Sequence, residues 1–75
     1  MTCKYSSIMN VMEIVARSKD SWSDAAQKGV SQAHKTIKCI RTIKVEDMTA
    51  QISEGFITEY VVRIKILYDV QEASQ

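Results

Sequence analysis

The residues best suited to chemistry are few and lie far apart in this 75-residue chain. His34 is the only histidine, and a metal ligand or general base needs partner groups that the surrounding sequence does not supply. No glycine-rich phosphate loop, nucleophile elbow or metal-binding helix motif occurs. We interpret His34 as an exposed side chain and expect that the protein is not an enzyme.

The two cysteines, Cys3 and Cys39, are 36 positions apart. Two isolated cysteines do not make the disulfide framework of a small secreted domain, so we expect no disulfide. Cys39 lies near Lys38 and Arg41, whose charges would favour a reactive thiolate. We favour the alternative that it is a small filler at the end of a helix.

Adjacent carboxylates and a set of basic residues are the remaining polar features. Glu46 and Asp47 are weak candidates for a cation site, which copies around a symmetry axis could complete, and the favoured alternative is a solvated bulge. Three basic residues on the predicted strands could bind phosphate across a subunit interface, although we favour pairing of these residues with Glu46 and Glu59 on neighbouring strands. That set is Lys44, Arg63 and Lys65.

Ten basic against nine acidic residues give a net charge of +1, which provides no general attraction to nucleic acid or anionic membranes. A basic helix carrying Lys28, Lys35 and Lys38 is the only feature that favours nucleic acid, and we expect no such partner. No apolar run reaches membrane-spanning length, and residues 1–7 lack the apolar core of a signal peptide. We expect a cytoplasmic protein without membrane contact.

The pattern of apolar residues predicts one helix and three strands. Residues 8–16 are predicted as a strand and 17–20 as a loop. Ser21 is a helix cap, and Asp24 at the third helical position completes a capping-box variant. Small residues then recur at three- and four-residue steps, which predicts a helix over 22–38 packed closely on a sheet. The apolar stripe consists of Trp22, Ala25, Ala26, Gly29, Val30, Ala33 and Ile37.

Two long strands follow the helix. In residues 40–52 the alternation changes parity near Glu46-Asp47, which predicts a bulge there. Residues 53–55 form a turn in which Gly55 supplies a positive φ, and the strand over 59–70 alternates cleanly. Strands of this length exceed what one short helix covers, so we expect neighbouring subunits to cover the rest. We predict a single domain over 8–70 with flexible tails at 1–7 and 71–75.

The order of strand, capped helix, long strand, turn and long strand resembles the dodecin family. The matching stretches are 11–16, 21–26, 35–37 and 52–60, with Val62, Ile64, Lys65 and Ile66. The resemblance implies an α+β fold, β-α-β-β, in which a three-stranded antiparallel sheet curls around one helix. It also implies a hollow homododecamer that stores or sequesters a small ligand, commonly a flavin (FMN, FAD or riboflavin), with Ca2+ in one type.

Three positions depart from the flavin pattern of that family. Thr42 stands where the stacking tryptophan is expected and has no aromatic face. Val61 stands where a glutamine would hydrogen-bond the ring edge, and Thr49 stands where an arginine is often found. These three positions are the candidate cofactor site, and their residue types disfavour flavin. The alternatives are a ligand-free structural oligomer and a calcium-type dodecin.

Overall fold

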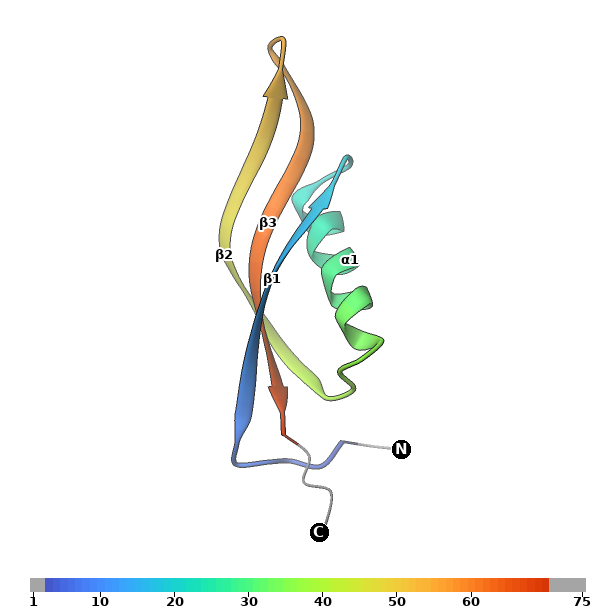
Figure 1. Cartoon of the computed structure of the whole chain (residues 1–75), viewed down its shortest axis with the longest axis vertical. Coiled ribbons are helices and arrows are strands. Elements are labelled where there is room, and N and C mark those ends of the chain that lie inside the picture. The colour runs from blue at the N-terminus through green and yellow to red at the C-terminus, as the bar shows by residue number, and fades with distance from the viewer. Residues whose placement is uncertain (1–2, 71–75) are drawn as a thin grey trace.

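The computed structural model describes residues 3–70 and contains one helix and one three-stranded sheet (Figure 1). The elements in chain order are β1 (Met9–Ser18), α1 (Trp22–His34), β2 (Ile40–Ser53) and β3 (Phe56–Asp69). β3 is the central strand and pairs antiparallel with β1 on one side and β2 on the other. The predicted β-α-β-β fold is therefore confirmed. Among residues 3–70 no helix has the length and hydropathy needed to cross a membrane.

The predicted helix start is confirmed, but the predicted end is wrong. Ser21 has extended backbone angles, and its side chain accepts a hydrogen bond from the backbone N–H of Asp24 at 2.9 Å. The helix ends at His34, four residues before the predicted Lys38, and closes through short-range bonds from the N–H groups of residues 35 and 36. Ile37 therefore lies in the loop between α1 and β2 and not on the helix.

The first strand is two residues longer at its end than predicted. Arg17 pairs with Val61 of β3 and Ser18 with Tyr60, although their polar side chains suggested a loop. Arg17 forms an exposed ion pair with Glu59 at 3.4 Å, which places its charge in solvent while its backbone stays in the sheet. Of the predicted flexible tails at 1–7 and 71–75, residues 1, 2 and 71–75 lie outside the described residues, while Cys3 is bonded to Cys39.

The hairpin of β2 and β3 has the predicted turn and the predicted bulge. Ser53 pairs with Phe56, so Glu54 and Gly55 form a two-residue turn, with φ of 51° and 83°. The register shifts between Val45 and Asp47, which leaves Glu46 as the bulged residue. Two further irregularities, at residues 40–42 and 51–52, were not expected from the sequence.

The core is thin and is formed where the helix lies on β1 and β3. We call this side of the sheet the helix face, and its centre consists of the fully buried Val62, Ile64 and Ile66. Gly29 brings the helix close to it, since a Cβ added there would lie 3.1 Å from Cβ of Ala16. The small helical residues therefore set a short distance between helix and sheet, as predicted.

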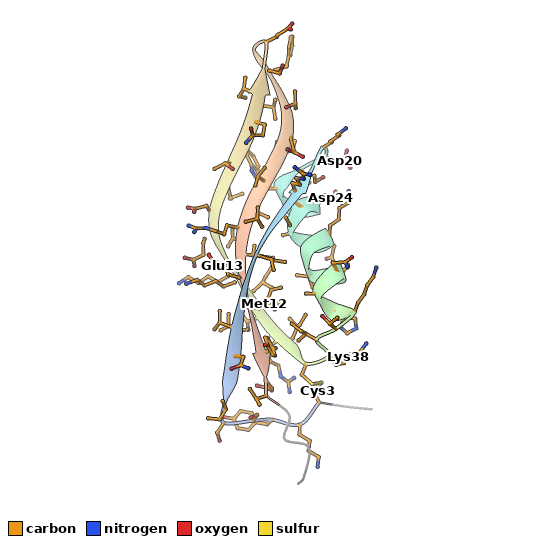
Figure 2. All side chains as sticks on the ribbon, viewed as in Figure 1. Cys3, Met12, Glu13, Asp20, Asp24 and Lys38 are labelled. Carbon is orange, nitrogen blue, oxygen red and sulfur yellow. A yellow bond between two sulfur atoms is a disulfide. The ribbon has the colours of Figure 1, made fainter. Side chains whose placement is uncertain are left out.

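A disulfide joins Cys3 to Cys39, so the expectation of unpaired cysteines is wrong. Their Cα atoms are 5.6 Å apart, within the range of protein disulfides. The segment before β1 folds back to the start of β2, which brings the two residues together despite 36 positions of separation (Figure 2). Sequence spacing alone carries no information on such a fold-back.

The subunit is elongated and exposes more surface than a compact domain of its size. Its radius of gyration is 15.0 Å, against roughly 11 Å for a compact 75-residue domain. Its accessible surface is 5652 Å², against about 4700 Å² expected for a monomer of this mass. The cause is the hairpin, whose tip extends well past the helix and the end of β1 (Figure 1).

Candidate functional site

The sheet has a second side, facing away from the helix, on which all three candidate ligand positions lie. We call it the open face, and its central strand contributes Val61, Arg63, Lys65 and Leu67, because side chains alternate along a strand. Thr42 pairs with Leu67, and Thr49 pairs with Val61. Thr42 and Thr49 are exposed and Val61 is half-buried, so each is available to a neighbouring molecule.

Within one subunit the three candidate positions do not form a single site. Thr49 and Val61 are direct cross-strand neighbours. Thr42 pairs with Leu67, which is six residues along β3 from Val61. Thr42 is therefore roughly 20 Å from the pair of Thr49 and Val61. A ligand shorter than this distance can touch all three positions only where copies of the chain bring them together.

The candidate metal ligands Glu46 and Asp47 are paired with cations of the open face. Glu46 lies 3.6 Å from Nζ of Lys44 and 4.0 Å from Nζ of Lys65, and Asp47 pairs with Arg63. Oε2 of Glu46 is buried and accepts no hydrogen bond among the described residues, because the Lys44 contact is an ion pair at too long a distance. Of the predicted cross-strand pairs, only that of Lys65 with Glu46 is confirmed. Lys44 is on the same strand as Glu46, Arg63 pairs with other carboxylates, and Glu59 pairs with Arg17.

Arg63 is the centre of this charged group. It contacts Asp47 and lies 3.5 Å from Oε2 of Glu13 on β1, so it links all three strands. The hydrogen bond and the charge of Asp47 raise the pKa of Arg63, with smaller contributions from Glu13 and Glu46. Over residues 3–70 no group of three or more potential metal ligands gathers. Within one subunit, the carboxylates of this face are paired with basic side chains and do not form a cation site.

A strip of apolar side chains along β2 has no cover within the subunit. The helix packs mainly against β1 and β3, and only its first residue, Trp22, bonds to β2. Val45 and Met48 pair with core residues of β3 and so project on the helix face, yet they are 44% and 57% exposed. The tip of the hairpin adds three more exposed apolar residues, Ile52, Phe56 and Ile57. Val45, Met48 and Ile52 lie on β2, whereas Phe56 and Ile57 are the first residues of β3. We call these five residues the uncovered strip.

Trp22 fixes the hairpin to the start of the helix. Its Nε1 donates a hydrogen bond to the carbonyl of Thr49 at 2.8 Å, and its ring meets that of Tyr60 edge-on at 4.8 Å. It packs half-buried against the core, as predicted from its place in the apolar stripe. The backbone of a candidate ligand position is thereby held by the helix, a contact that no sequence pattern indicated.

The opposite end of the sheet contains two features that sequence reasoning missed. One is the Cys3–Cys39 disulfide. The other is an ion pair in which Nε of Arg41 lies 2.6 Å from Oδ2 of Asp69, a buried carboxylate. No signal in the sequence indicated this ion pair, because the irregular register that redirects the side chain of Arg41 at residues 40–42 is visible only in the structure.

Comparison with known proteins identifies the fold. The family model described as Dodecin matches residues 8–71. The chain belongs to the dodecin family. The match covers most of the chain, so the resemblance seen in the sequence and the fold seen in the structure agree. No curated protein is similar enough to count as a match.

Solved dodecin structures superpose closely on the chain. A point mutant of the dodecin of Thermus thermophilus has a TM-score of 0.83 at 23% identity, covering 87% of this chain and 97% of that one. The dodecin of Streptomyces coelicolor has a TM-score of 0.83 at 24% identity, covering 88% and 94%. The calcium-chelating dodecin of Mycobacterium tuberculosis, described with a calcium-binding site, has a TM-score of 0.76 at 26% identity, covering 92% and 97%.

Proposed function

We propose that the protein is one subunit of a closed homododecameric shell that sequesters a small ligand or ion at its subunit interfaces. The uncovered strip is the observation that carries this proposal. An elongated subunit that exposes Met48 and Phe56 beside a thin core gains stability when copies bury those side chains. Membership of the dodecin family supports a shell of twelve subunits, the number that the resemblance in the sequence implied.

The ligand proposal rests on the open face. Thr42, Thr49 and Val61 are accessible there and can be brought together only by more than one subunit. Without an aromatic ring at Thr42, the site lacks the stacking surface that a flavin ring requires. We therefore propose a ligand smaller or less aromatic than FMN, FAD or riboflavin, and we propose no catalytic role.

A cation is the second candidate, and the calcium-chelating relative is the observation that favours it. Glu46 and Asp47 are the proposed ligands, completed by copies around a symmetry axis. Their charges are balanced by Lys44, Lys65 and Arg63 within the subunit, so Ca2+ would have to compete with these cations. Calorimetric titration with Ca2+ tests this: stoichiometric binding that Glu46→Gln removes supports it, and no binding contradicts it.

The disulfide bears on the cellular compartment in which the protein works. The sequence favoured the cytoplasm, whereas disulfides persist mainly in oxidising compartments. We propose that the protein works where the Cys3–Cys39 bond can form.

Substitution in the uncovered strip tests the shell directly. Met48→Asp places a charge on a surface that the proposal buries, so we expect light scattering to show subunits or small oligomers. The matched control is Gln32→Asp on the exposed side of the helix, which should keep the wild-type mass. An unchanged mass in both variants would contradict the proposal.

A further inference from the structure

The sheet continues past the end of the helix and leaves a cavity there. α1 ends at His34, while Asn10 and Tyr68, paired with each other, extend the helix face beyond it. An open groove of about 450 Å³, which we call the cavity, lies between this end of the sheet and the loop that leads into β2. Its volume is in the range of small-molecule sites.

The walls of the cavity are mainly apolar. They include Ile37, Cys39 and Val70, together with the half-buried Tyr68. Cys39 is held in the disulfide with Cys3 and presents sulfur without a titratable thiol. Ile37 reaches the cavity because it lies in the loop and not on the helix. Such walls suit a flat apolar body, and Tyr68 offers an aromatic ring for it to contact.

The rim of the cavity is positively charged. Lys38 is exposed and forms no ion pair among residues 3–70, and the amide of Asn10 makes no side-chain hydrogen bond there. Asp69 also lines the cavity, but its buried carboxylate is paired with Arg41 and does not offset Lys38. Figure 2 shows Lys38 at this end of the molecule, close to Cys3. A cation and an amide at the mouth of an apolar cavity match a carboxylate.

We propose that this cavity binds a small aromatic carboxylate. The ring of the ligand lies between Ile37 and Tyr68, and its carboxylate accepts hydrogen bonds from Nζ of Lys38 and the amide of Asn10. The site is on the helix face and so is separate from Thr42, Thr49 and Val61 on the open face. It lies within one subunit and stands whether or not the shell forms.

Calorimetric titration of the full chain with 2-naphthoate tests the inference. We expect saturable binding at one naphthoate per chain. Lys38→Gln should weaken it about two- to fivefold, the effect of losing one exposed ion pair. The matched control is Lys35→Gln, which removes an exposed lysine that does not line the cavity and should leave the affinity unchanged. The neutral 2-naphthamide should bind more weakly and equally to both variants.

A second variant distinguishes naphthoate bound in the cavity from naphthoate bound elsewhere on the surface. Val70→Phe fills part of the cavity and should abolish naphthoate binding, while light scattering on the same sample reports whether assembly is retained. Absence of saturable binding, or equal weakening by Lys38→Gln and Lys35→Gln, would overturn the inference. A protein that binds naphthoate as a monomer would contradict the shell proposal and leave this site standing.

Discussion

Gly29 sets the distance between helix and sheet in this subunit. A Cβ at this position would lie 3.1 Å from Cβ of Ala16 and 3.2 Å from Cδ1 of Ile14. The atom from Ala16 is fixed to the backbone of β1, so it cannot move aside without moving the strand. The helix could not approach β1 this closely with a larger residue here.

Gly29→Val should therefore destabilise the protein even though glycine is a poor helix former. The added Cβ meets Cβ of Ala16, which is fixed to the backbone, and the side-chain ends of Ile14 and Ile64, and we expect a loss of about 2–3 kcal/mol in the free energy of unfolding. Chemical denaturation measures it. Ser31→Val on the exposed side of the same helix is the control and should change stability by about 0.5 kcal/mol or less. Equal effects at both positions would refute the role of close packing.

Some residue roles were predictable and others were not. Ser21 and Gly55 each meet a local backbone requirement, so the sequence alone identifies the cap and the turn. Cys3 and Arg41 act through partners 36 and 28 positions away, and local patterns carry no information about contacts at such separations. The roles of Thr42, Thr49 and Val61 stay predictions, because one subunit does not bring them together.

The start of α1 is stabilised by a group of hydrogen bonds around Asp24. Oγ of Ser18 donates to its carboxylate at 2.6 Å, and Nζ of Lys28 lies 2.9 Å away. These contacts, the Ser18 bond first, lower the pKa of Asp24 below its ordinary value. They join the last residue of β1 to the first turn of the helix.

This lowered pKa predicts a pH dependence of stability. Because the folded protein holds the carboxylate ionised, the contribution of Asp24 is present above the ordinary pKa near 4 and is lost as pH falls below it. Asp24→Asn should destabilise the protein at pH 7, and the difference from wild type should shrink between about pH 4 and about pH 2. Denaturation curves at several pH values measure it. A difference that does not change with pH would contradict this account.

The end of α1 shows what the sequence could not reveal. Ile37 continues the helical spacing and no glycine or proline follows His34 before β2, so periodicity predicts a helix to Lys38. The structure instead tightens the turn at residues 35 and 36, and the chain then crosses to Cys39 and β2. Local bonds to the last carbonyls, including one from Oγ1 of Thr36 to Ala33 at 3.3 Å, accompany this end, and the pattern of apolar residues does not reveal them.

The disulfide between the N-terminal segment and β2 predicts sensitivity to reductants. It closes a loop of 36 positions, for which chain entropy gives about 4 kcal/mol of stabilisation. A dithiol reductant should therefore lower the denaturation midpoint of the wild type to that of the Cys3→Ser/Cys39→Ser double variant, and should leave the variant unchanged. If reduction does not shift the wild-type curve, the disulfide does not contribute as described.

At the scale of the whole molecule, a single subunit is an incomplete structure. A thin core, an excess of exposed surface and an uncovered strip along β2 all follow from long strands with one short helix. The strand lengths already indicated that one short helix would leave part of the sheet uncovered. The arrangement of the copies, and with it the ligand site, depends on contacts between chains that one sequence does not specify.

Native mass spectrometry of the purified full-length protein tests the central claim most directly. We expect a single species of twelve chains of 8.5 kDa, about 102 kDa, with any extra mass equal to a bound ligand or ion. The same protein dissociated in acid should give only the chain mass. A species of one or two chains under native conditions, at concentrations where the protein is folded, would contradict the account.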